Sequence, residues 1–284
     1  MPETKPAAWA GAAVGATQPQ PHEAAKIDIT GFKPLVAVEF TRGDAKGRPF
    51  AVSRTVEAKF DVRGFTPKGL DEKACKAAIA EAKLVHFLDL DAKDADVVFA
   101  ACGAELKAFL ARGGALILSR TPTGPAAQAF LKEVDVFDPN AKTEKCVGDN
   151  NGTWCGPDGH PYLTACHKSS GRKDAPGEQF WVWSDICNTC QGQCAFLEWD
   201  KARQTALFRP VNDGEGKAFV ILQENVCGKG RVLFNRNYRI FTDFYEGKRA
   251  GDNFLTYLTG TLVTEHAKKA TAYNGGPGKP VEEY

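Results

Sequence analysis

Residues 94–119, DADVVFAACGAELKAFLARGGALILS, decide the fold class of this chain. The stretch contains an apolar run at 96–101, an amphipathic helical period at 105–112 and a second apolar run at 115–119. Gly113-Gly114 ends the helix and begins the turn into the second run. The pattern therefore predicts a strand, a crossover helix and a second strand.

The same alternation continues on both sides of this stretch. Helices are predicted at 71–83, 125–134 and 252–263. Strands are predicted at 35–40, within 49–62, and at 85–88, 195–199, 205–208, 218–222 and 232–234, with Gly228–Gly230 forming a hairpin turn. Strands separated by helices of this length predict an α/β fold with a mainly parallel sheet flanked by helices.

The rest of the chain divides by composition. Residues 1–30 are rich in alanine, proline and glutamine and predict an extended arm or linker, and residues 266–284 predict a tail. Between them we expect one domain at 31–265. It carries an insertion at about 140–195 that is rich in cysteine and tryptophan.

Charge and hydropathy narrow the classes of partner. The 36 lysines and arginines nearly balance the 35 acidic residues, which leaves a formal net charge of +1. This balance predicts neither nucleic acid nor an anionic membrane surface as a partner. No window approaches the roughly 20 apolar residues of a membrane-spanning helix. No complete signal peptide is visible, so a trimmed terminus and a cytoplasmic start both stay open.

Nine cysteines are present, and six of them fall in the insertion. Disulfides holding this polar loop are the favoured interpretation, which places the protein outside the cell or in the periplasm. A zinc site that uses Cys187 and Cys190 is the alternative, with a cytoplasmic location, and no other cofactor is expected. The candidates for disulfides or metal ligands are Cys146, Cys155, Cys166, Cys187, Cys190 and Cys194.

Two groups of residues are candidates for a ligand or partner surface. Trp154, Trp181 and Trp183 could stack on sugar rings or contact a protein, although a small local core is the favoured interpretation. The second group, Arg236, Tyr238 and Arg239, follows the last predicted strand, where ligands bind in open α/β folds, although ordinary surface charge is the favoured interpretation.

The order of elements resembles the class I glutamine-amidotransferase-like superfamily. The resemblance rests on residues 94–119, GHPYLTA (159–165), GEQFWVW (177–183), VILQENVCGKGRVLFN (220–235) and DNFLTYLTG (252–260). The nearest branches are the trehalose-utilisation-like proteins and the amidotransferase-like domain of some β-galactosidases. The resemblance covers roughly residues 33–263 apart from the insertion, and it implies a flavodoxin-like sheet.

The residues that carry chemistry in the catalytic members of that superfamily differ here. The family's nucleophilic cysteine ends the strand after the Gly-Gly turn, where this chain has Ser119 without the glycines of a strained elbow. The later stretch at 235–244, NRNYRIFTDF, contains no histidine. Cys102 has no obvious histidine partner and is expected to be structural. We therefore predict no catalytic residue.

These observations favour a non-catalytic, amidotransferase-like structural or interaction subunit of an extracellular or envelope assembly, with other protein subunits as partners. A carbohydrate-binding or carbohydrate-active protein that uses the aromatic insertion is one alternative. A cytosolic, zinc-stabilised accessory protein is the other.

Overall fold

The computed structural model places many of the predicted elements. It describes residues 35–42, 60–88, 90–119, 122–138, 141–144, 154–155, 194–210, 218, 220–235 and 253–259. The predicted arm at 1–30 and the predicted tail at 266–284 lie outside these residues. None of the helices within the described ranges is both long and apolar enough to cross a membrane.

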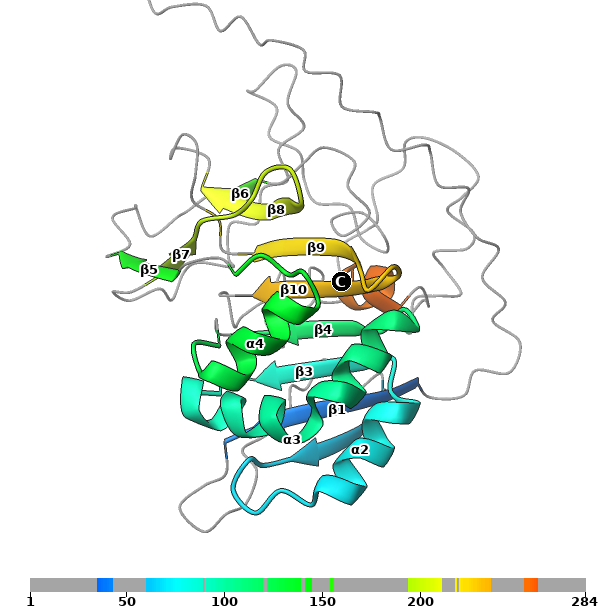
Figure 1. The fold of residues 1–284 in the computed structure, drawn as a ribbon. Helices are drawn as coiled ribbons and strands as arrows, with labels where there is room; N and C mark the ends of the chain where they lie inside the picture. Colours follow the sequence, from blue (N-terminus) through cyan, green and yellow to red (C-terminus); the bar gives the residue numbers. More distant parts are fainter. Residues whose placement is uncertain are drawn as a thin grey trace, which may run out of the picture. The chain divides into compact units, whose positions relative to one another are not determined.

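Apolar strands pair into one mixed sheet in the order β2-β1-β3-β4-β10-β9-β8-β6 (Figure 1). The first five strands in this order run parallel to one another: β2 (Phe60–Phe65), β1 (Leu35–Thr41), β3 (Leu84–Leu88), β4 (Ala115–Leu118) and β10 (Gly230–Asn235). The remaining strands are antiparallel: β9 (Val220–Val226), β8 (Gln204–Pro210) and β6 (Trp154–Cys155). The predicted α/β class with a mostly parallel sheet is confirmed.

Three helices, α2 (Glu72–Glu81), α3 (Ala92–Ala111) and α4 (Pro125–Glu133), cover one face of this sheet (Figure 1). Their buried side chains join every second residue of the central strands in one core. The strand members of that core include Val38, Phe40, Val85, Phe87, Leu116 and Leu118.

Residues 253–259 form a helical segment that packs on the other face. Arg231 of β10 points to that face, because its neighbour Val232 joins the helix-side core. The Arg231 guanidinium donates to the Leu258 carbonyl at 3.1 Å and lies 4.9 Å from the centre of the Tyr257 ring. The parallel sheet is therefore covered on both faces next to β10, as its apolar strands require.

Helix α3 corrects the sequence analysis, because the predicted strand at 96–101 is wrong. The Asp91 carboxylate caps this helix by accepting a hydrogen bond from the Asp94 N–H at 2.9 Å. The adjacent valines and Phe99 suggested a strand, but only one side of this run is buried: Val98 is inaccessible, whereas Val97 is 41% exposed. A single helix of 20 residues therefore connects β3 to β4.

Two glycines allow close packing around α3. A Cβ atom on Gly114 would lie 2.3 Å from the ring of Phe109, which is fully buried. A Cβ atom on Gly230, at the start of β10, would lie 2.8 Å from Cβ of Leu110. Gly230 follows the predicted hairpin turn, which is confirmed: β9 and β10 are antiparallel, and Gly228 in the turn has φ of 92°.

The ends of the predicted insertion lie side by side. Strand β5 (Ala141–Glu144) pairs antiparallel with β7 (Cys194–Leu197), so that Glu144 is opposite Cys194. The chain therefore leaves and rejoins the α/β domain through one two-stranded ribbon. Of the segment between these strands, only β6 is described.

Candidate functional site

A chain of three hydrogen-bonded polar side chains crosses the parallel part of the sheet. Nδ1 of His86 lies 2.9 Å from Oε1 of Glu39, and Nε2 of His86 lies 3.1 Å from Oγ of Ser119. Glu39 belongs to β1, His86 to β3, and Ser119 directly follows β4. A serine, a histidine and a carboxylate bonded in this order form the arrangement that activates a serine hydroxyl for nucleophilic attack.

Strand register explains why these three residues meet. The register pairs Glu39 with His86 and His86 with Ile117, and paired residues project from the same face of a sheet. Ser119 lies two residues beyond Ile117 and therefore projects from that face as well. It is the face opposite to α2, α3 and α4, because Phe40 and Phe87, the neighbours of Glu39 and His86, join the helix-side core.

The three side chains differ in their exposure to solvent. Glu39 and His86 are both 0% exposed, whereas Ser119 is partly exposed. A buried carboxylate needs partners, and an ionised one can only accept hydrogen bonds. When Nδ1 carries the ring proton and donates it to Glu39, Nε2 is left to accept from the Ser119 hydroxyl. In this tautomer the imidazole can take the hydroxyl proton.

Ser119 lies at the carboxyl edge of the sheet, level with two other polar residues. The registers place Thr41 at the end of β1 and Asn235 at the end of β10 in the same row as Ser119. Thr41 is 1% exposed, and its Oγ1 has no hydrogen-bond partner within the described part of the chain. The chain passes from β1 to β2 on one side and later to β3 on the other, and ligands of open α/β sheets bind at such a switch point.

The backbone of Ser119 is that of an ordinary strand end. Its N–H donates to the Phe87 carbonyl at 3.1 Å, which extends the β3–β4 pairing by one residue. Among the described non-glycine residues, positive φ angles occur at Asp135, Asn225 and Cys227 and not at Ser119. Ser119 therefore lacks the left-handed conformation of a sharp nucleophile turn, as its sequence neighbours predict.

The N-terminus of α4 follows Ser119 along the chain. Gly124 caps this helix without a side-chain hydrogen bond, and Pro125 occupies its first turn. Oδ1 of Asp96 on α3 accepts a hydrogen bond from the Ala127 N–H at 2.9 Å. One of the free N–H groups of α4 is therefore already satisfied by a carboxylate of the protein.

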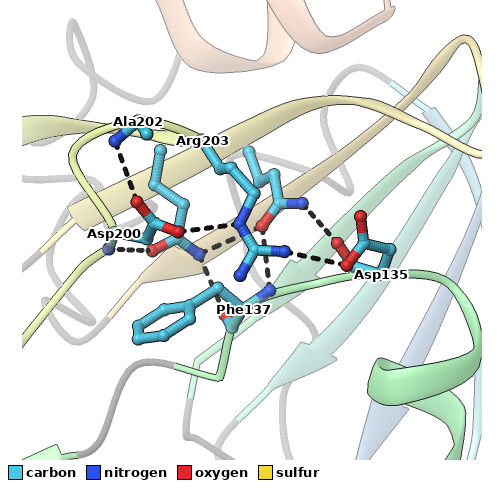
Figure 2. A network of polar contacts seen from close by, with 7 residues as sticks. Asp135, Phe137, Asp200, Ala202 and Arg203 are labelled. Carbon is cyan, nitrogen blue, oxygen red and sulfur yellow. Dashed lines mark hydrogen bonds and ion pairs between the residues drawn. The ribbon is translucent and has the colours of Figure 1, made fainter.

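A second polar network joins the segment after α4 to the antiparallel strands (Figure 2). Nε2 of Gln223 donates to the Asp135 carbonyl at 2.7 Å, and its Oε1 accepts from the Phe137 N–H at 3.0 Å. Nε2 of Gln204 donates to the Phe137 carbonyl at 2.9 Å, and Oε1 of Gln204 accepts from the Asp200 N–H at 3.1 Å. Both residues are 5% exposed, and their amides bond backbone groups and each other, with Gln204 Nε2 donating to Gln223 Oε1 at 3.2 Å, which indicates a structural role.

Arg203 closes this network on its exposed side. Its guanidinium donates to Asp200 Oδ2 and Asp135 Oδ1, each at 2.8 Å, and lies 5.6 Å from the centre of the Phe137 ring. The hydrogen bond from Arg203 holds the pKa of Asp200 below its usual range. The network thus ties the segment after α4 to β9 and to the start of β8.

Many of the residues that the sequence analysis singled out lie outside the described residues. These are Cys146, Cys166, Cys187, Cys190, Trp181, Trp183, Arg236, Tyr238 and Arg239. The backbones of Trp154 and Cys155 lie in β6, and that of Cys194 lies in β7. Among the described side chains, no group of three or more potential metal ligands gathers. The disulfide, zinc and aromatic-surface hypotheses stay predictions.

The sequence analysis missed Glu39 and His86 and did not favour Ser119. The available signal was an ionisable residue at an alternate position of an otherwise apolar strand, in LVAVEFT and in LVHFL. Such a residue projects from a buried face and needs a partner on a neighbouring strand. Neither any protein-family model nor any curated protein matches this sequence.

Proposed function

We propose that this protein transfers or hydrolyses an acyl group, with Ser119 as the nucleophile, His86 as the general base and Glu39 as the group that orients His86. The observation that carries the proposal is the continuous hydrogen-bonded chain from Glu39 through His86 to Ser119. Its nucleophile end lies at the carboxyl edge of the sheet and is the partly exposed end.

The chemistry follows from the two hydrogen bonds. As Oγ of Ser119 attacks a carbonyl carbon, Nε2 of His86 takes the hydroxyl proton and the carbonyl oxygen gains the negative charge. The buried carboxylate of Glu39 stabilises the imidazolium, which then protonates the leaving group. The bond between the carbonyl carbon and the leaving group breaks, the carbonyl re-forms, and the acyl group stays on Oγ of Ser119. Water activated by His86 attacks the acyl group in the second half of the reaction and restores Ser119.

The strand order supports this assignment. Numbered among themselves, the five parallel strands follow the order 2-1-3-4-5, which is that of flavodoxin-like folds. In the superfamily that the sequence resembles, the nucleophile ends the strand after the Gly-Gly turn. Ser119 occupies the corresponding position in this chain, and an oxygen nucleophile needs an adjacent base more than a thiol does.

Ester hydrolysis tests the proposal. The full chain is assayed with p-nitrophenyl esters of short and medium acids. Ser119→Ala is expected to lower kcat/KM by at least about 10³-fold, and Glu39→Gln by a comparable factor, because the amide no longer favours the required tautomer. Glu72→Gln is the control, because this exposed carboxylate belongs to α2, on the opposite side of the sheet from Ser119. Equal activity of the wild type and Ser119→Ala would refute the proposal.

A second candidate is the non-catalytic, amidotransferase-like structural or interaction subunit. The ordinary backbone of Ser119 and the complete burial of His86 favour it, because both limit access of a substrate to the nucleophile. The Glu39–His86–Ser119 chain would then fix the register of β1, β3 and β4 as a buried polar network. Ser119→Ala and Ser119→Cys would affect only stability, and neither variant would differ from the wild type in the ester assay.

A further inference from the structure

A pair of buried thiols bridges two helices on the other side of the sheet. Sγ of Cys75 on α2 lies 3.5 Å from Sγ of Cys102 on α3, and both residues are 0% exposed. The third cysteine with a described side chain, Cys227, is half-buried and is a free thiol. The two thiols are 27 positions apart in the sequence and come together because α2 and α3 pack against each other on one face of the sheet.

From this juxtaposition we propose that Cys75 and Cys102 are a specific disulfide-forming site, which cross-links α2 to α3 when a low-molecular-weight disulfide acts as the oxidant. Two sulfurs at 3.5 Å are in van der Waals contact, and a disulfide requires them to approach to about 2.05 Å. The site is independent of Ser119, His86 and Glu39, which project from the opposite face.

The hydrogen bond between the two thiols favours ionisation of one of them. The hydrogen bond between the two thiols lowers the pKa of Cys102, and the same bond together with burial raises the pKa of Cys75. The Cys102 thiolate attacks one sulfur of the external disulfide and forms a mixed disulfide, while the first small thiol leaves. The Cys75 sulfur gives up its proton, attacks Sγ of Cys102 and displaces the second small thiol. Two protein thiols are oxidised, and one external disulfide is reduced to two thiols.

Helix α2 provides the access that this reaction needs. It contains 10 residues, of which Cys75, Ala78 and Ile79 are buried, whereas α3 contains 20 residues, seven of them buried. Local opening of α2 therefore removes little apolar surface from the core and exposes both thiols together. When α2 closes again on a mixed disulfide, the buried position has no room for the attached small thiol. Attack by the neighbouring cysteine, which displaces the small thiol, is therefore favoured.

Peptide mapping of the full native chain tests the proposal. The protein is incubated with oxidised glutathione, its remaining thiols are alkylated, and trypsin then releases Cys75 in the peptide 74–76 and Cys102 in the peptide 94–107. We expect these two peptides to be linked in most molecules, with a mass two hydrogens below their sum. We also expect thermal unfolding several degrees above that of the reduced chain.

Cys102→Ala should abolish the linked peptide and the thermal shift, whereas the matched control Cys227→Ser should preserve both. The mapping of the wild type does not depend on how well either variant folds. Recovery of Cys75 and Cys102 as separate alkylated peptides, as glutathione adducts, or joined to cysteines of the insertion would overturn the proposal.

Discussion

Nδ1 of His86 lies 2.9 Å from Oε1 of Glu39, and neither residue has any surface exposed to solvent. Removing one member of a buried hydrogen-bonded pair costs free energy, because the other polar group loses that hydrogen bond away from water. The Glu39–His86 hydrogen bond is therefore expected to contribute to folding stability as well as to the proposed chemistry.

Glu39→Ala is expected to lower the free energy of unfolding by about 1–3 kcal/mol, because the buried imidazole loses its hydrogen bond to Glu39. Urea denaturation followed by circular dichroism measures the change. Glu81→Ala is the control, since this carboxylate pairs with Arg63 while 58% exposed, and should cost about 1 kcal/mol or less. Similar losses in both variants would mean that the Glu39–His86 pair has no special role.

Gln223→Ala tests the polar network of Figure 2. The substitution removes the acceptor of the Phe137 N–H and the donor to the Asp135 carbonyl, so we expect a loss of about 2–3 kcal/mol in urea unfolding. Arg203→Ala removes only the exposed part of the network and should lose clearly less. A larger loss for Arg203→Ala would contradict the structural role given to the buried amides.

Gly114→Ala and Gly103→Ala form a matched pair at α3. The new Cβ at position 114 would lie 2.3 Å from the buried Phe109 ring, which should cost about 1–3 kcal/mol. At position 103 the nearest atom, Cδ2 of Phe130, is 3.9 Å away, and alanine in a helix interior should add about 0.5–1 kcal/mol of stability. Thermal unfolding should therefore shift in opposite directions, and two shifts of the same sign would contradict the packing described here.

Asp138→Asn should change how stability depends on pH. Burial raises the pKa of Asp138, although a hydrogen bond from Gln128 Nε2 at 2.8 Å opposes this shift. Because the folded pKa lies above the unfolded value, the folded state binds more protons between the two, and stability falls as the pH rises through that window. The variant cannot ionise, so it should be more stable than the wild type at neutral pH and show a flatter slope from about pH 4 upward. Parallel pH profiles for both proteins would contradict this account.

Local patterns in the sequence predict much of the fold, because strand and helix periods depend on neighbouring residues. Helix 71–83, the strands around residues 86 and 117, and the hairpin at Gly228 are all present. The strand predicted at 96–101 is wrong because two adjacent valines outweighed a helical burial period that continues to Leu110. Burial of one side only distinguishes the two, and burial depends on the tertiary structure.

The candidate site could not be predicted from local patterns. Glu39, His86 and Ser119 are separated by 47 and 33 positions, and each comes from a different strand. They meet because β3 lies beside β1 and β4 lies beside β3, a strand order that no short motif encodes. The Cys75–Cys102 contact depends on the same order, since it sets which helices are neighbours.

Covalent labelling of Ser119 tests the central claim most directly. The native chain is treated with a fluorophosphonate probe, which reacts with serines activated by a neighbouring base, and the modified residue is located by mass spectrometry. The account predicts a single probe on Ser119 of the wild type, no label on Ser119→Ala, and a strongly reduced labelling rate for His86→Gln at unchanged fold by circular dichroism. An unlabelled wild-type Ser119, or labelling that does not depend on His86, would contradict the claim that these residues form a working nucleophilic site.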